Sequence, residues 1–205
     1  MEERNQDPQQ TPDEELLLAA QAGDMTAFEM LHRRYRTQIL NYLYRFTGSY
    51  HTAEELTQEV FIKVYTHLAT YRNMGKAKSW MYTIATNLAK NALRSLKSSP
   101  QISLDTSVNE EDTRKLGEMV GDGRNLGGDL ERRELQKQLH EAIHTLPVKY
   151  REVLLLCGQQ RLSYKEAGRI LHCSEQTVGV RLNRARKMLK NYINPNDYVQ
   201  SGGCK

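Results

Sequence analysis

Apolar residues recur every three or four positions along most of the chain, which is the spacing of amphipathic helices. Four such stripes lie between residues 13 and 97, separated by polar stretches and glycines. The clearest runs from Phe28 to Phe46, and Gly48 is expected to end its helix. Two further stripes follow, from Leu56 to Leu68 and from Trp80 to Leu96. The pattern predicts one helical domain over residues 13–97.

Residues that favour helix starts precede several of these stripes. Thr11 and Thr52 each begin a Thr-x-x-Glu capping box, and Ser163 begins a Ser-x-x-Glu box. Asp24 and Ser174 are predicted to cap the helices that follow them. Five predicted caps in one chain favour an all-α fold.

The pattern changes after residue 97. Residues 98–128 are rich in Ser, Asn, Asp and Gly and show no apolar period, so we predict a flexible acidic linker. Helical spacing returns over residues 129–192, where a helix is expected from Pro147 through Cys157. Two short helices separated by a tight turn then end this second small domain, in the arrangement of a helix-turn-helix. We expect disorder in residues 1–12 and 193–205.

Nothing in the sequence indicates a membrane or a secreted fold. No apolar run approaches the ~18 residues of a membrane span. The first twelve residues are polar and acidic, unlike a secretory signal. Three scattered cysteines are too few for a disulfide framework. We therefore expect a cytoplasmic protein that needs no cofactor and no metal.

The net charge of +4 conceals two basic blocks. Residues 24–97 and residues 129–192 each carry a net charge of +6, whereas residues 1–23 carry −5 and residues 98–128 carry −3. Two basic domains joined by an acidic connector suggest two contacts with a polyanion. On charge alone, two ordinary solvated helical surfaces are an equally good interpretation.

The second basic block has the chemistry of a DNA reader. In a helix-turn-helix the N-terminal residues of the second helix meet base edges in the major groove. Gln pairs with adenine, Glu accepts from cytosine, and Thr contacts the thymine methyl group. Cations further along the helix suit phosphates. The predicted DNA-binding residues are Glu175, Gln176, Thr177, Arg181, Arg184 and Arg186.

The end of the first domain mixes aromatic, amide and cationic side chains. Flat rings and positive charge are what unstacked single-stranded DNA requires. Asn87 and Asn91 lie four apart, on one face of the predicted helix. The spacing of Trp80 to Ile84 and Leu88 also permits a plain core position for the indole. The candidates are Lys76, Trp80, Tyr82, Asn87, Lys90 and Asn91.

Four segments, in order, resemble the extracytoplasmic-function (ECF) sigma factors of bacteria. Residues 51–65 are similar to the family pattern D-A-E-D-L-x-Q-E-V-F-x-K-x-[WY], and residues 79–87 to [ST]-W-L-Y-x-I-A-x-N. Residues 146–156 resemble L-P-x-x-x-R-E-V-[LF], and residues 162–186 resemble the helix that reads the minus-thirty-five element. The sequence departs from the family at Gly179, where a cation is usual, and at Ala167-Gly168, where I-A is usual.

The resemblance implies a function and partners. It implies a transcription initiation factor, not an enzyme, that binds core RNA polymerase at the β′ clamp helices and β flap and recognises and melts promoter DNA. The first domain would serve the minus-ten element and the helix-turn-helix the minus-thirty-five element. An anti-sigma factor is a further expected partner, and it could hold the chain at the membrane. The residues implied in polymerase docking are Glu55, Gln58, Glu59, Phe61 and Lys63.

The sequence also admits two other functions. Residues 140–144 match H-E-x-x-H, in which two histidines on one helix bind zinc and the glutamate acts as base. The motif is short, and Ile143 between the histidines belongs to a core stripe. A helix-turn-helix regulator without polymerase docking would lack the segment from Glu54 to Tyr65, which this chain has.

Overall fold

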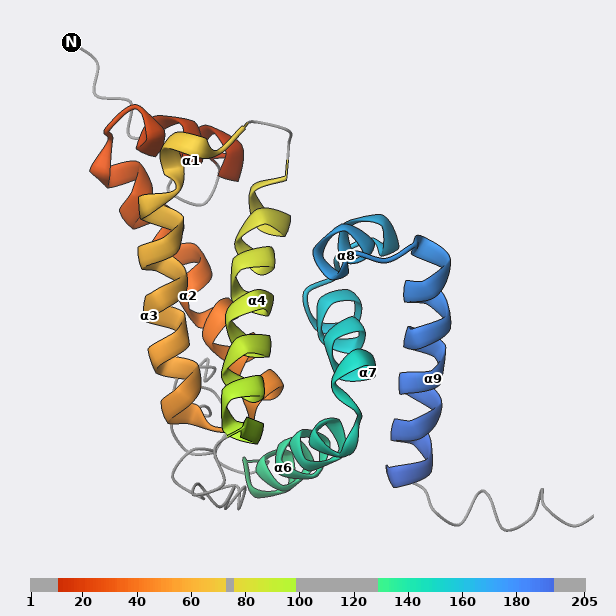
Figure 1. The fold of residues 1–205 in the computed structure, drawn as a ribbon. Helices are drawn as coiled ribbons and strands as arrows, with labels where there is room; N and C mark the ends of the chain where they lie inside the picture. The colour runs from red at the N-terminus through yellow and green to blue at the C-terminus, as the bar shows by residue number, and fades with distance from the viewer. Residues whose placement is uncertain (1–10, 73–75, 99–128, 194–205) are drawn as a thin grey trace, which may run out of the picture.

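The computed structural model describes residues 11–72, 76–98 and 129–193, and every regular element in those ranges is helical (Figure 1). The predicted all-α class is confirmed. The linker predicted over residues 98–128 and the two predicted disordered ends fall almost wholly outside the described residues. Among the described helices, none is both long and apolar enough to cross a membrane.

The first lobe contains the elements up to residue 98. They are α1 (Asp13–Gln21), α2 (Met25–Thr47), α3 (Tyr50–Thr66), the 3-10 turn η1 (Leu68–Thr70) and α4 (Ala77–Ser98). Helices α2, α3 and α4 pack along one another, and α1 lies across one end of them (Figure 1). Asp24 caps α2 by accepting hydrogen bonds from the backbone N–H groups of Thr26 and Ala27, at 2.9 and 3.2 Å. Gly48 ends α2 with a φ of +88°, in the left-handed region that favours glycine.

Two predicted helix starts were wrong. Pro12, not Thr11, occupies the N-cap of α1, and no side chain caps that helix. Its first residue, Asp13, instead pairs with Arg34 and accepts from the Tyr35 hydroxyl. Helix α3 begins at Tyr50 because Ser49 already caps it, accepting from the Thr52 N–H at 3.2 Å. Thr52 therefore lies within the first turn of α3.

The second lobe contains α6 (Asp129–Thr145), α7 (Val148–Val153), the π-helix η2 (Leu154–Gln159), α8 (Tyr164–Leu171) and α9 (Glu175–Ile193). The helix expected from Pro147 through Cys157 is α-helical only as far as Val153 and then widens into η2. The capping box at Ser163 is confirmed: the Glu166 N–H donates to Ser163 Oγ, and the Ser163 N–H donates to Glu166 Oε2 at 2.8 Å.

The two lobes share one hydrophobic core. Helix α4 of the first lobe packs against α8, and α2 packs against α6 and η2 (Figure 1). The buried cluster runs without a break from Leu17 and Tyr82 in the first lobe to Leu156 and Ile170 in the second. This packing matters for function because α4 and α9 carry the residues predicted to bind DNA.

Candidate nucleic-acid interface

A tight helix-turn-helix is formed by α8 and α9. His172 ends α8 in the left-handed conformation, with φ +52°, and Ser174 starts α9 by accepting from the Thr177 N–H at 3.1 Å. The turn lies directly over Gly168, whose carbonyl accepts from the Cys173 N–H at 2.9 Å. A Cβ on Gly168 would meet the Cys173 carbonyl oxygen at 2.7 Å, which is too close. The departure from the family pattern at Gly168 thus has a steric reason.

Gly168→Ala is expected to lower the free energy of unfolding by about 1 to 3 kcal/mol, because a backbone oxygen blocks the new methyl group. Gly179→Ala is the matched control, since its Cβ would make ordinary contact with the Tyr164 ring, at 3.5 Å, in the interior of α9. That change should stabilise the chain by up to about 1 kcal/mol. Urea unfolding followed by circular dichroism measures both, and equal losses would contradict this account of the turn.

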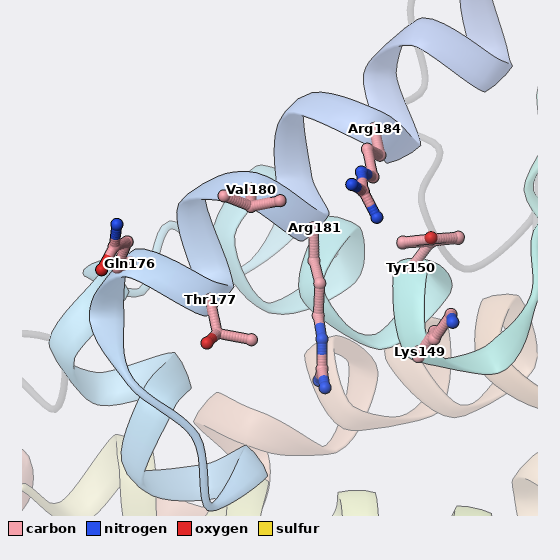
Figure 2. Close-up of a pocket in the computed structure, with 7 residues that line it drawn as sticks. All are labelled: Lys149, Tyr150, Gln176, Thr177, Val180, Arg181 and Arg184. Carbon is pink, nitrogen blue, oxygen red and sulfur yellow. The ribbon is translucent and has the colours of Figure 1, made fainter.

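The exposed face of α9 carries the residues predicted for the minus-thirty-five element. Glu175 and Gln176 are exposed at its start, and Arg184 and Arg186 are exposed further along. A shallow pocket runs between α9 and the start of α7, and Figure 2 shows Arg184 reaching toward the Tyr150 ring. The pocket is lined by Lys149, Tyr150, Gln176, Thr177, Val180, Arg181 and Arg184. The arrangement brings Gln176, Thr177, Arg181 and Arg184 together.

Sequence reasoning missed two members of this surface, Lys149 and Tyr150. The neighbouring Arg184 guanidinium lowers the pKa of the Tyr150 phenol. Both residues follow Pro147 at the N-terminus of α7 (Figure 2), within the segment that resembles L-P-x-x-x-R-E-V. Their position directly after a predicted helix start was the signal available in the sequence.

The residues predicted for the minus-ten element divide between two faces of α4. The outer face carries Trp80, Asn87 and Asn91, which line one pocket together with Lys63 and His67 of the neighbouring segment. The Trp80 ring is half-buried and packs on Tyr71, with ring centroids 4.8 Å apart. Asn87 and Asn91 are exposed. A half-exposed ring beside two amides and a cation has the composition of a base-binding surface.

The inner face of α4 is closed by the second lobe. Tyr82 is fully buried, and its hydroxyl donates to Gln160 Oε1 at 2.5 Å. Lys78 donates to the Gln160 backbone carbonyl at 2.7 Å, and Ser79 Oγ donates to Glu166 Oε1 at 3.1 Å. In this arrangement the Tyr82 side chain is closed off from DNA. Lys76, at the start of α4, is half-buried.

Glu152 joins the two predicted DNA surfaces. Its side chain is only 5% exposed, and its Oε2 lies 2.7 Å from Lys90 Nζ on α4. Its other oxygen, Oε1, lies 3.5 Å from Arg181 Nη1 on α9. One carboxylate therefore holds a cation from each lobe.

The H-E-x-x-H histidines are packed between the lobes. The His140 ring stacks on Tyr44 of α2, with centroids 4.2 Å apart, and lies 4.6 Å from the His144 ring. Burial lowers the pKa of His140 to about 3 and that of His144 to about 4, with Arg151 adding to both shifts. In the described part of the chain, no three His, Cys, Asp or Glu residues gather as a metal site would require. The positive charge of Arg45 and Arg151 nearby also disfavours a cation here.

The residues implied in polymerase docking lie along α3. Glu55, Gln58 and Glu59 are exposed, and Lys63 pairs with Glu59 at 3.6 Å. Phe61 is buried instead, packing edge-on against His32 with ring centroids 4.4 Å apart. The docking prediction omitted the most exposed apolar side chains of this helix, Ile62 at 62% and Tyr65 at 50%. Both lie within residues 51–65, but the similarity of that segment to the family pattern does not indicate which of its side chains are exposed.

Comparison with known proteins finds the same family in both lobes. The family model described as Sigma-70 region 2 matches residues 31–99, and the model described as Sigma-70, region 4 matches residues 136–189. The RNA polymerase sigma-H factor of Pseudomonas aeruginosa is 31% identical over 193 residues, which cover 91% of this chain and 96% of the relative. The ECF RNA polymerase sigma factor SigW of Bacillus subtilis is 33% identical over 172 residues, covering 83% and 91% of the two chains.

Two solved structures share the fold. CnrH, in complex with the cytosolic domain of CnrY, superimposes with a TM-score of 0.65 at 20% identity, covering 91% of this chain and 99% of CnrH. The sigma factor RpoE of Bartonella quintana, in complex with the anti-sigma factor NepR, gives a TM-score of 0.64 at 19% identity, covering 82% and 98%. At these identities the likeness concerns the fold.

Proposed function

Because this chain belongs to the ECF sigma factors of the sigma-70 family, we propose that it docks on core RNA polymerase through α3 and reads the promoter through α4 and α9. It is a sigma factor that directs promoter-specific transcription initiation. The observation that carries the assignment of surfaces is the placement of the two matched regions, one on each lobe and in order along the chain.

Helix α9 is assigned to the minus-thirty-five element. Gln176 and Thr177 stand in the first turn after the Ser174 cap, where a recognition helix meets base edges. With Glu175, they carry side chains of the types that read base edges: glutamate accepts from cytosine, glutamine pairs with adenine, and threonine contacts the thymine methyl group. Arg181, Arg184 and Arg186 hold phosphates and fix the register on the duplex.

The outer face of α4 is assigned to the minus-ten element. Melting exposes bases that stack on Trp80 and form hydrogen bonds with Asn87 and Asn91. Lys76 balances the backbone charge. Tyr82 and Lys90 belong to the same predicted set. They reach DNA only after the second lobe has moved away from α4.

Helix α3 is assigned to the β′ clamp helices of core polymerase. Its exposed polar residues Glu55, Gln58 and Glu59 flank the apolar side chains of Ile62 and Tyr65. An apolar centre with a polar rim is the usual composition of a protein interface. The second lobe then contacts the β flap.

The remaining expectations follow from the family. Sigma factors are initiation factors, and we assign this chain no catalytic activity of its own; phosphodiester bonds are formed by the polymerase. An anti-sigma factor is the expected inhibitor, which fits the complex in which the Bartonella quintana relative was solved. We place the chain in the cytoplasm, bound to polymerase at the nucleoid or held at the membrane by that inhibitor.

Run-off transcription with purified core polymerase tests the proposal. With a pool of genomic promoter fragments, discrete transcripts are expected only when the chain is added. Arg184→Ala should reduce their yield about tenfold through a lost phosphate contact, whereas Arg169→Ala, an exposed cation on α8, should leave the yield unchanged. Duplex binding without any transcript would instead indicate a helix-turn-helix regulator.

A further inference from the structure

The cations of the two predicted DNA surfaces do not all face solvent. Lys90 of α4 and Arg181 of α9 both turn toward Glu152 on α7, at 2.7 and 3.5 Å. Lys90 and Arg181 are each 28% exposed at the side chain, and Glu152 is almost completely buried between them. This carboxylate therefore pairs with Lys90 across the contact between the lobes and with Arg181 within the second lobe.

A carboxylate held between two cations resembles a DNA phosphate in charge and in hydrogen-bonding geometry. Lysine and arginine bind both groups through the same N–H donors. A cation that is paired inside the protein has to lose that partner before it binds DNA. An intramolecular partner is always present at high effective concentration, so the competition is substantial.

Three hydrogen bonds between the lobes stabilise the same closed arrangement. The Tyr82 hydroxyl donates to Gln160, Lys78 to the Gln160 carbonyl, and Ser79 to Glu166. These three bonds run between α4 and the segment from η2 to α8, on one side of Glu152. Separating α4 from the second lobe therefore breaks several contacts together, which favours two discrete states over a gradual opening.

We propose that Glu152 is a built-in competitor of promoter DNA, which holds Lys90 of the first lobe in a closed state of the free chain and pairs with Arg181 within its own lobe. The proposal rests on the assignment of these two cations to the promoter surfaces. DNA, or the polymerase that separates the lobes, replaces the carboxylate. The affinity of the free chain for DNA is then lowered by the fraction of molecules that are open.

Glu152→Gln is the sharpest change, because it keeps the shape of the side chain and removes the charge. In the full chain it should tighten binding to a random-sequence 30-base-pair duplex by about tenfold, measured by fluorescence anisotropy. Glu141→Gln is the matched control. It removes the same charge from the same lobe, at a residue of α6 that makes no ion pair with either cation. Equal gains for the two variants would overturn the proposal.

A second measurement needs no variant. A carbodiimide joins an amine to a carboxylate without a spacer, so it should link Lys90 to Glu152 in the free chain, as detected by mass spectrometry. Saturating duplex should suppress this link, because the DNA phosphates then hold Lys90. A Lys90–Glu152 link that survives saturating duplex would also overturn the proposal. Neither readout uses polymerase. A failure of the proposed function in run-off transcription can therefore be told apart from a failure of the Glu152 proposal.

Discussion

Arg151→Met is expected to lower the free energy of unfolding by about 3 to 5 kcal/mol, because it leaves several buried carbonyls without a donor, at about 1 to 3 kcal/mol for each such group. The Arg151 side chain is buried, and it donates to the carbonyls of Phe46 at 2.7 Å, His144 at 2.6 Å and Leu146 at 3.2 Å. Burial lowers the pKa of Arg151 to about 10, so the guanidinium remains charged at neutral pH.

The position of these carbonyls explains the size of the effect. Phe46 lies in the last turn of α2, and His144 lies in the last turn of α6, where carbonyls lack a partner within the helix. The negative ends of two helix dipoles thus converge on one guanidinium. Methionine fills similar space but donates no hydrogen bond, which leaves three carbonyls without this donor.

Urea unfolding distinguishes this role from a general surface effect. Arg169→Met, on the exposed side of α8, is the control and should change the free energy by less than about 0.5 kcal/mol. Arg151→Lys should fall between the two, since lysine is also charged but cannot span three carbonyls. The Met variant should also unfold in two steps, because α2 and the second lobe lose their shared donor. A loss no greater than that of Arg169→Met would refute the role.

The helices could be predicted from the sequence because each carries a local signal. The cap at Asp24, the glycine at position 48 and the capping box at Ser163 all act within four residues, and all three are found in the structure. The two wrong helix starts, predicted at Thr11 and Thr52, also came from a local sequence pattern. A Thr-x-x-Glu pattern does not reveal that Ser49 already caps the helix three residues earlier.

The placement of the site residues depended on long-range packing. Tyr82 and Trp80 are both aromatic and two residues apart, so they project from opposite faces of α4. Periodicity finds one buried face, but α4 is covered on one side by the first lobe and on another by α8. The sequence therefore could not show that Tyr82 is the buried ring and Trp80 the half-exposed one.

Neighbouring residues on α7 couple the lobes in two ways. Arg151 joins them through backbone carbonyls, and Glu152, which also pairs with Arg181 in its own lobe, joins them through Lys90. The first connection uses backbone groups that DNA does not compete for. The second uses cations that DNA also attracts. Loss of Arg151 should therefore weaken the packing between the two lobes, whereas loss of Glu152 should act mainly on DNA binding.

The histidines between the lobes make the same packing sensitive to acid. His140 and His144 are held neutral, since burial lowers their pKa values from the ordinary 6.5 to about 3 and about 4. Arg45 of α2 and Arg151 of α7 add positive charge, and α9, which also packs on α6, carries no acidic residue after Glu175. The acids nearest to His144 in sequence are Glu141, on α6 itself, and Glu152, which is engaged by Lys90 and Arg181.

Lowering the pH from 7.5 to 5.5 is therefore expected to cost about 1 kcal/mol of stability for each of these histidines. The unfolded chain takes up protons below pH 6.5, whereas the folded chain does so only near pH 3 to 4, so stability is full above pH 6.5 and falls as the pH drops toward 4.

His140→Phe keeps the aromatic stack on Tyr44 but cannot titrate, and it should remove about half of the loss. His67→Phe, at an exposed position on the first lobe, is the control and should leave the pH dependence unchanged. Urea unfolding between pH 5.5 and 7.5 measures the effect. A His140→Phe profile that parallels the unsubstituted chain would show that the buried pair is not the acid-sensitive element.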